Sequence, residues 1–290
     1  ELASCPLRFF FIRILRSRGM AKTPEPGEPS PVEIGNSLHE ALDLLGKTKA
    51  PDVASALAAS PSFKDLKARL EALHPALAGA AEFRLQAWLK DFIEWDRAHI
   101  AERGVVKVRT ELKMERKLGD LSLHGRPDRL LELASGLKII QDLKTGGRIE
   151  NNLDKKDMLR GRRLQVPLYA WLSAREGEVL PESEIVALGP AADGLDGGNR
   201  APGVKKLEDI IGGILESVEV LVSQAASGRF PFPEDPPCSY CDFKPACRKG
   251  EAPTEQRILE GPLFQIYQKV QAKSTKAPML EDFRMGETEE

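Results

Sequence analysis

The sequence predicts an α/β fold in which a mixed β-sheet is flanked by helices. Three observations lead to this prediction: helix-like segments fill the first hundred residues, strand-like alternation begins at Val105, and helical and strand segments alternate after Asn151. An order of helices, strands, hairpin, helix, strand and helix is typical of a sheet covered by helices. With 290 residues, the chain can form one large domain or two small ones.

The first third of the chain is predicted to be helical. The segments with a helical apolar period are residues 2–18, 32–45 and 51–102, separated by a proline-rich loop at 21–31. Pro61 and Pro75 are expected to break the last of these into shorter helices. Trp88, Phe92 and Trp95 recur at helical spacing within it, and we interpret them as core residues.

Strand patterns occupy the middle of the chain. Residues 105–114 alternate as a strand with Glu111 near its end, and residues 118–123 are expected to continue the same sheet. Two apolar runs then flank the turn signal at residues 134–136, which predicts a β-hairpin.

The segments after the hairpin are predicted from composition and period. Residues 151–163 are polar and basic, with five lysines and arginines that could contact phosphates. The expected elements that follow are a helix at 164–176, a strand at 184–188, a mobile loop at 191–203, a helix at 205–227, a proline-rich connector at 228–237, a helix at 252–273 and a disordered acidic tail.

Composition excludes some classes of protein. The formal net charge is −2, so nucleic-acid contacts must come from local basic patches. No apolar run approaches the ~20 residues that a membrane-spanning helix needs. The run of three phenylalanines near the N-terminus lies between arginines and lacks a small-residue cleavage site, which argues against a signal peptide. We expect a cytoplasmic protein, and the start at Glu1 suggests a fragment of something longer.

The hairpin places charged side chains together. Asp142 and Lys144 lie two residues apart on the second strand and therefore share a face, and the hairpin can fold Asp128 back beside them. Such a cluster is costly unless a cation or a phosphate completes it. Carboxylates suit a hard divalent ion, and a lysine beside them suits a phosphate. The pattern alone also fits a solvated surface hairpin.

Four cysteines form the second candidate site. Cys238, Cys241 and Cys247 lie in a compact proline-rich segment, and the remaining cysteine is Cys5. The two-residue spacing of the first pair suits a metal and strains a disulfide. Four thiolates could hold a [4Fe–4S] cluster or zinc, and spacing does not separate the two. If Cys5 is a ligand, the site closes a long loop and is structural.

These motifs resemble those of known nucleases. Gly125-Arg126-Pro127-Asp128 followed by a strand that ends in Asp142-Leu143-Lys144 is similar to the core of the PD-(D/E)XK nuclease superfamily. The segment from Cys5 to Phe10, with the C-x2-C-x5-C cluster after the core, resembles the iron–sulfur nuclease domain of AddB-type helicase–nuclease subunits. Nucleases of CRISPR adaptation share a similar cysteine layout.

The resemblance implies roles for individual residues. A G-x-x-x-H-E helix, here Gly35 to Glu40, donates His39 to the catalytic metal in the RecB-like branch. His39, Asp128, Asp142 and the carbonyl of Leu143 would then bind Mg²⁺ or Mn²⁺, and Lys144 would act on the attacking water. A Q-x-x-x-Y helix, here Gln165 and Tyr169, would position the DNA strand. The role of Glu111 is left open. The remaining histidines, interpreted as structural, are His74, His99 and His124.

The implied function is a metal-dependent DNA exonuclease of double-strand-break repair, in which metal-activated water cuts single strands delivered by an AddA-type helicase. Residues 1–250 would form the iron–sulfur nuclease domain, with 51–102 as a helical insertion and 251–290 as a C-terminal helix and tail. Three alternatives stay open: a stand-alone nuclease of the CRISPR-adaptation type, a catalytically silent DNA-binding scaffold for a helicase, and a zinc-bound structural module. No Walker phosphate loop is present in the sequence.

Overall fold

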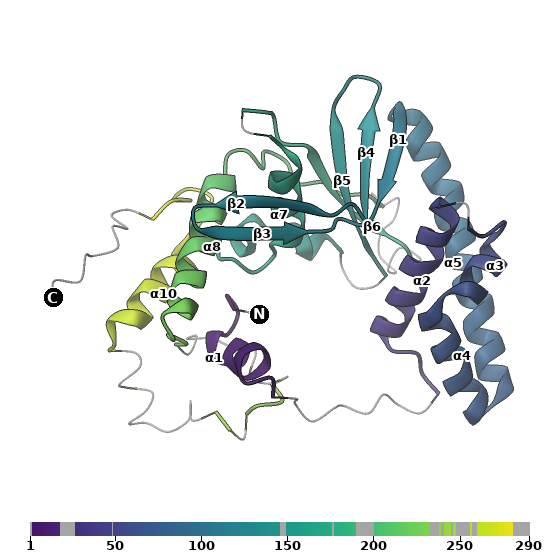
Figure 1. Cartoon of the computed structure of the whole chain (residues 1–290), viewed down its shortest axis with the longest axis horizontal. Coiled ribbons are helices and arrows are strands. Elements are labelled where there is room, and N and C mark those ends of the chain that lie inside the picture. The colour runs from purple at the N-terminus through teal and green to yellow at the C-terminus, as the bar shows by residue number, and fades with distance from the viewer. Residues whose placement is uncertain are drawn as a thin grey trace.

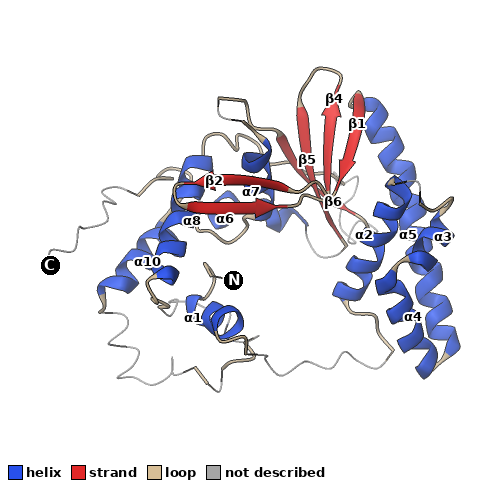
Figure 2. Ribbon diagram, in the orientation of Figure 1, coloured by secondary structure: helices blue, strands red, loops and turns tan. Residues whose placement is uncertain are grey.

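The computed structural model has a central β-sheet with helices on both faces (Figures 1 and 2). The fold class predicted from the sequence is therefore confirmed. The residues that the structure describes are 2–17, 27–47, 49–145, 149–175, 177–189, 200–231, 238, 241–244, 246–247, 256 and 260–280.

Four strands form the sheet in the order β1-β4-β5-β6. The pairs β1–β4 and β4–β5 are antiparallel, while β5–β6 is parallel, so the sheet is mixed. The bounds are Val105–Thr110 for β1, Arg129–Leu133 for β4, Lys138–Lys144 for β5 and Glu182–Ala187 for β6. The predicted hairpin is β4–β5, and Gly136 takes a φ of +85° in its turn. Residues 139–143 of β5 are all buried, because helices cover both faces there.

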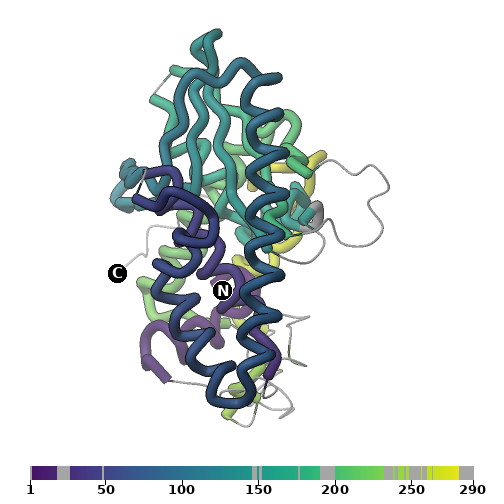
Figure 3. Tube along the Cα trace, turned by 90° about the vertical axis from the view of Figure 1, so that its right-hand side faces the viewer, coloured from purple at the N-terminus to yellow at the C-terminus, as the bar shows by residue number. Residues whose placement is uncertain are grey.

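One face of the sheet is covered by the N-terminal helices. These are α2 (Pro31–Gly46), α3 (Val53–Ala59), α4 (Pro61–Leu73) and α5 (Pro75–Glu102). The predicted breaks at Pro61 and Pro75 are confirmed, because each proline opens a helix at its first position. Figure 3 shows the long helix α5 running alongside the sheet. The fully buried Leu38, Phe63 and Leu85 pack with Leu143 and Val186 of the sheet.

The other face is covered by later elements. A 3-10 turn (Ile149–Leu153) and α6 (Lys155–Leu159) lead into α7 (Gln165–Ser173), whose Val166 packs on Ile185 and Ala187 of β6. The helices α8 (Ile211–Ala226) and α10 (Pro262–Ala272) follow. Backbone hydrogen bonds from Ile185, Ala187 and Val204 join β6 to the segment at 200–204, which covers this edge of the sheet.

The predicted strand at 105–114 is wrong in its extent. The chain leaves β1 at Thr110, because Glu111 has a φ of +51° and turns the backbone out of the strand. The expectation that residues 118–123 continue the sheet is also wrong. β2 (Met114–Leu118) and β3 (Leu121–Gly125) pair only with each other, around a turn in which Gly119 has a φ of +54°. Figure 1 shows this hairpin projecting sideways from the central sheet.

Two predicted helices start later than expected. The first is α1 (Pro6–Phe9), continued by a π-helical turn (Phe10–Ile14), and Cys5 with an extended backbone is its N-cap. The helix expected from residue 205 begins at Ile211, after turns that include Lys206 at a φ of +53°. The helix predicted at 252–273 lies partly outside the described residues; Gln256 is helical, and α10 spans Pro262–Ala272. Parts of the predicted loops at 21–31, 191–203 and 228–237, and all of the acidic tail, lie outside the described residues.

The N-terminal residues lie against the C-terminal part of the chain. The Phe11 ring stacks on Phe243 with centroids 5.2 Å apart, next to the cysteine segment. The buried Tyr267 of α10 donates a hydrogen bond of 2.6 Å to the carbonyl of Ala3. A small core of α8, α10 and Ala3 closes this region. Among the described residues, no helix has the length and apolar character that a membrane crossing requires.

Candidate metal centre and active site

The hairpin β4–β5 brings Asp128 to the end of β5. Arg129 pairs with Gln141 in the antiparallel register, so the residue before β4 meets the residues after Gln141. Oδ2 of Asp128 accepts a hydrogen bond of 2.7 Å from the backbone amide of Leu143. The carboxylate is thereby fixed beside the Asp142-Leu143-Lys144 segment.

Helix α2 places His39 against the same point. Nε2 of His39 lies 3.1 Å from the carbonyl oxygen of Leu143, and Nδ1 lies 3.4 Å from Oδ1 of Asp128. Burial lowers the pKa of His39, but the hydrogen bond and charge of Asp128 outweigh burial and raise the pKa above its usual value. A Cβ on Gly35, one turn earlier, would lie 3.4 Å from Oγ1 of Thr145, so the helix lies in contact with the chain after β5.

Glu111 joins this group through the break in the first strand. Its amide donates a hydrogen bond of 3.1 Å to the carbonyl of Asp128, and its carboxylate pairs with Arg126 at 2.6 Å. Ligand atoms of His39, Glu111 and Asp128 all lie within 4.8 Å of one another. Burial raises the pKa of Glu111, Arg126 opposes this, and the Asp128 charge adds to it. The sequence left the role of Glu111 open, and its place inside a predicted strand concealed the turn that positions it.

Asp142 and Lys144 lie on the α7 face of β5. Nζ of Lys144 is 2.8 Å from Oδ2 of Asp142, a residue that is 2% exposed. Apart from this ion pair, Oδ2 has no hydrogen-bond partner among the described residues. Burial raises the pKa of Asp142, Lys144 lowers it, and the Asp128 charge raises it further. A buried carboxylate is costly unless cations lie beside it, and Lys144 supplies one such charge.

Helix α7 adds the next residues. Nζ of Lys144 donates a hydrogen bond of 3.2 Å to Oε1 of Gln165. Burial raises the pKa of Tyr169, the Asp142 charge raises it further, and the contact with Gln165 lowers it. A Cβ on Gly125 would lie only 2.9 Å from the Tyr169 ring and 2.5 Å from Leu172, so glycine allows β3 to approach α7.

These side chains fit a divalent metal ion. The donors are carboxylate oxygens, one imidazole nitrogen and one backbone carbonyl, a set suited to Mg²⁺ or Mn²⁺. Mg²⁺ takes ligands at about 2.0–2.1 Å in octahedral geometry, so neighbouring ligand atoms lie about 3 Å apart. The 3.1 Å between His39 and the Leu143 carbonyl matches this spacing. Asp142 lies outside the group of three, but its charge acts on the same residues.

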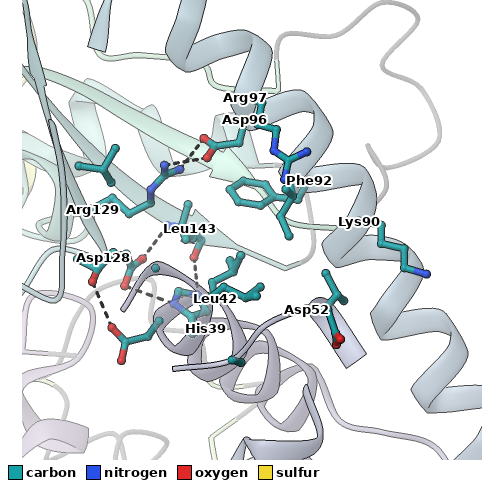
Figure 4. Close-up of a pocket in the computed structure, with 18 of the residues that line it drawn as sticks. His39, Leu42, Asp52, Lys90, Phe92, Asp96, Arg97, Asp128, Arg129 and Leu143 are labelled. Atoms are coloured by element: carbon teal, nitrogen blue, oxygen red, sulfur yellow. Dashed lines mark hydrogen bonds and ion pairs between the residues drawn. The ribbon is translucent and has the colours of Figure 1, made fainter. Parts of the chain in front are cut away.

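A hollow of about 1200 Å³ opens beside this centre, on the face of the sheet that the N-terminal helices cover. Figure 4 shows His39, Asp128 and Leu143 together on one wall, with Lys90 and Asp52 across from them. The metal centre therefore opens onto this hollow, which α2, α3 and α5 line.

The comparison with protein families bears on this geometry. The sequence profile described as the PD-(D/E)XK nuclease superfamily matches residues 1–248 of the 290. The chain belongs to this superfamily. Membership implies that the chain is a nuclease, that it uses a divalent metal ion and that its substrate is nucleic acid.

Other comparisons are more distant. A search of the curated proteins finds no significant match. Among solved structures, the chain is similar to the crystal structure of SSO0001, with 13% identity over 83% of this chain and 93% of that one, at a TM-score of 0.31. It is also similar to protein VC1899 from Vibrio cholerae, with 12% identity over 55% of this chain and 42% of that one, at a TM-score of 0.25.

Glu40, beside His39 in the motif of the RecB-like branch, points away from the centre. Its carboxylate accepts hydrogen bonds from the hydroxyl of Ser60 at 2.6 Å and from the amide and hydroxyl of Ser62 at 2.9 and 2.7 Å. Ser60 is also the N-cap of α4. Glu40 therefore holds α2 to the start of α4, so its role in this nuclease is to support the helix that carries His39.

The other histidines lie away from the centre. His74 accepts a hydrogen bond from the amide of Ala76 at the start of α5. His99 stacks on Trp95, and the exposed His124 lies 3.7 Å from Glu115 on the β2–β3 hairpin. None of them belongs to the group around Asp128 within the described part of the nuclease.

The four cysteines carry free thiols and are partly buried. Sγ of Cys5 accepts a hydrogen bond of 3.4 Å from the amide of Arg8. Burial raises the pKa of Cys5, and the Arg8 amide lowers it. The ring of Phe11 stacks on Phe243, which lies between Cys241 and Cys247, so the N-terminal segment contacts the C-terminal cysteine segment.

Proposed function

We propose that this nuclease cuts DNA strands by metal-dependent hydrolysis of the phosphodiester. The observation that carries the proposal is the convergence of His39, Glu111 and Asp128 beside the Leu143 carbonyl and the buried Asp142. A solvated surface hairpin would not bury the carboxylate of Asp142, which is 2% exposed.

The proposed ligands of Mg²⁺ or Mn²⁺ are His39, Asp128, Asp142 and the Leu143 carbonyl, and we add Glu111 to this set. When bound, the metal would activate water and stabilise charge on the phosphoryl oxygens. The backbone amide of Leu143 orients Asp128, and Asp128 in turn faces the ring of His39. These contacts among the proposed ligands orient their side chains before the ion binds.

Lys144 is proposed to act on the attacking water and on the charge that develops at phosphorus. Its ammonium lies between Asp142 and Gln165, which restricts where it can point. Gln165 thereby positions Lys144, and Tyr169 faces the substrate strand beside Asp142. Because the expected contacts are to phosphates, we predict little base specificity.

The test is a cleavage assay on end-labelled single- and double-stranded DNA with Mg²⁺, Mn²⁺ or EDTA. The parent is compared with Asp128→Asn and with Asp65→Asn, which changes an exposed aspartate on α4. We expect metal-dependent cutting that Asp128→Asn abolishes and Asp65→Asn preserves, and the labelled end reports polarity. Equal cutting by the parent and Asp128→Asn would contradict the proposal. No cutting by folded parent protein would favour the silent DNA-binding scaffold.

We further propose an exonuclease of double-strand-break repair that receives the 5′-ended strand from an AddA-type helicase. Support comes from the contact between the N-terminal segment that carries Cys5 and the C-terminal cysteine segment, through Phe11 and Phe243. The stand-alone CRISPR-adaptation type is the second candidate, and a cytoplasmic location fits both. Stimulation of cutting by an AddA-type helicase on duplex ends would favour the first.

Cys5, Cys238, Cys241 and Cys247 are the proposed ligands of a [4Fe–4S] cluster. The support is the resemblance of their layout to AddB-type nuclease domains, because four thiolates at this spacing could equally hold zinc. Anaerobic purification should give a brown protein, and Cys5→Ser should lose the colour. A colourless protein with stoichiometric zinc would contradict this.

A further inference from the structure

We infer that a small basic hollow beside the active site binds one backbone phosphate of the substrate strand, next to the phosphate that is cut. The inference rests on the proposed nuclease function, and it adds which side of the metal centre the substrate strand occupies. The hollow, called the phosphate pocket here, has a volume of about 100 Å³. Its polar lining residues are Asp142, Lys144, Asn152, Arg162, Arg163 and Gln165.

The phosphate pocket adjoins the proposed metal centre. Asp142 and Lys144 line it, so a phosphate in the pocket lies next to the residues proposed to carry the chemistry. Asp142 is 2% exposed, and its Oδ2 has no hydrogen-bond partner among the described residues besides the ion pair with Lys144. This ion pair places the Lys144 ammonium at the wall that the pocket shares with the metal centre.

Charge distinguishes the two hollows beside the metal centre. The 1200 Å³ hollow is lined by six carboxylate residues and three lysines or arginines, and one of its arginines, Arg129, is already paired with Asp96. The phosphate pocket has three cations, Lys144, Arg162 and Arg163, and one carboxylate, Asp142, which pairs with Lys144. Asp157 lies 3.7 Å from both arginines, so the pocket and its neighbours still carry one more cation than carboxylate. A polyanion is attracted to the second and repelled by the first. The strand backbone therefore lies on the α7 side.

The donors of the phosphate pocket are held in place. The Arg163 guanidinium donates to Oδ1 of Asn152 at 2.9 Å and lies 3.7 Å from Asp157, and its side chain is 45% exposed. Five donors on a guanidinium leave others for a phosphate. The start of α7 also lines the pocket, and Leu164 at its cap makes no side-chain capping hydrogen bond. Amides at a helix N-terminus add to the attraction for an anion.

Helix α10 supports one wall of the pocket from outside the matched family region. Arg162 donates a hydrogen bond of 2.8 Å to Oε1 of Gln271, and Nε2 of Gln271 donates one of 3.2 Å to the carbonyl of Arg160. Between these arginines, Gly161 has a φ of +79°, and a Cβ there would lie 2.8 Å from Leu221. Gln271 is therefore a positioning residue for Arg162.

The first test measures steady-state cleavage of a single-stranded oligonucleotide by Arg163→Gln, Arg163→Lys and Gln271→Ala. The control is Arg175→Gln, an arginine beyond the opposite end of α7 that is 89% exposed. Loss of one charge-assisted phosphate contact should raise KM roughly tenfold for Arg163→Gln with kcat nearly unchanged. Arg163→Lys should recover part of this loss, Gln271→Ala should raise KM less, and the control should match the parent.

The second test assigns the contact to one phosphate. Oligonucleotides with a single neutral methylphosphonate are tested for binding in EDTA by fluorescence anisotropy. At one position, the methylphosphonate should weaken binding of the oligonucleotide to the parent. At that same position it should not weaken binding to Arg163→Gln any further. The salt dependence of single-strand binding should also fall by about 0.7 in log–log slope for Arg163→Gln.

The outcomes separate the two proposals. Unchanged KM and salt slope in Arg163→Gln, in an enzyme that Asp128→Asn inactivates, would overturn the phosphate pocket alone. Full activity of Asp128→Asn would overturn the proposed function. If the parent binds strands without cutting them, the anisotropy measurements still decide whether Arg163 contacts a phosphate. Thermal denaturation of each variant checks that it is folded.

Discussion

Neighbouring residues of β5 point to opposite faces of the sheet and enter two different polar clusters. Gln141 faces α5, where its amide donates a hydrogen bond of 2.9 Å to Glu184. On the same face, Arg129 makes two hydrogen bonds to Asp96, at 2.7 and 2.9 Å. Asp142 faces α7, where Lys144 pairs with an oxygen that has no other partner among the described residues.

The α5 cluster holds the helical part to the sheet. The Arg129–Asp96 pair is bidentate, and Arg129 is 7% exposed with its guanidinium 5.9 Å from the centre of the Phe92 ring. Nε2 of His99 has no hydrogen-bond partner in the described residues, although it lies 3.6 Å from Glu184. The two clusters therefore differ in their strongest ion pair. The Arg129–Asp96 pair joins α5 to the sheet and stabilises the fold, whereas the Asp142–Lys144 pair lies beside the proposed metal centre.

The largest effect is expected at Asp142. Asp142→Asn should lower kcat at least about a thousandfold, because loss of a metal ligand removes several kcal/mol of transition-state stabilisation. The free energy of unfolding without metal should not fall, since the amide removes a buried charge. Cleavage of labelled DNA and urea denaturation measure the two quantities. A large loss of stability would mean that Asp142 belongs to the fold, as the α5 cluster does.

Asp96→Asn should show the opposite pattern. It leaves the Arg129 guanidinium buried without its charged partner, which should lower the free energy of unfolding by about 3 kcal/mol. Activity per folded molecule should fall less than tenfold. Urea denaturation of Asp96→Asn, Arg129→Gln and the double variant gives the coupling between the two residues. Additive losses would contradict the pairing.

Lys144→Ala should reduce the rate on the order of a hundredfold, the usual contribution of a general acid or base. The matched control is Lys138→Ala at the other end of β5, where the lysine is 37% exposed and lies 3.8 Å from Glu178. The control should retain parental activity. Single-turnover cleavage measures the chemical step, and a Lys144→Ala protein as fast as the parent would remove the lysine from the mechanism.

The smallest effect is expected from pH on the α5 cluster. Burial raises the pKa of Glu184, but the contacts with His99 and Gln141 and the Arg103 charge outweigh it, so the pKa lies below 4.5. Folding then favours the ionised form of Glu184, and this preference stabilises the protein above pH 4.5. The stabilisation is lost as the pH falls through the folded-state pKa. Glu184→Gln should flatten this acid dependence of unfolding. An unchanged pH profile of unfolding would mean that other carboxylates cause the loss of stability in acid.

The sequence by itself determined the features that depend on neighbouring residues. Pro61 and Pro75 open helices because proline suits the first helical position. The β4–β5 hairpin follows from two apolar runs around a glycine turn, and the two-residue period puts Asp142 and Lys144 on one face. The proximity of Asp128 to this strand was predictable for the same reason, whereas the boundary at residue 250 stays a prediction.

Only the tertiary structure decided which distant residues complete the site. Glu111 reaches His39 and Asp128 because a left-handed residue ends β1, a conformation that alternation does not reveal. Glu40 turns to Ser60 and Ser62 although it adjoins His39, since successive helical residues point about 100° apart. Arg162 faces the phosphate pocket because α10 holds it from more than a hundred residues away. Such contacts depend on the packing of whole elements, which no local pattern encodes.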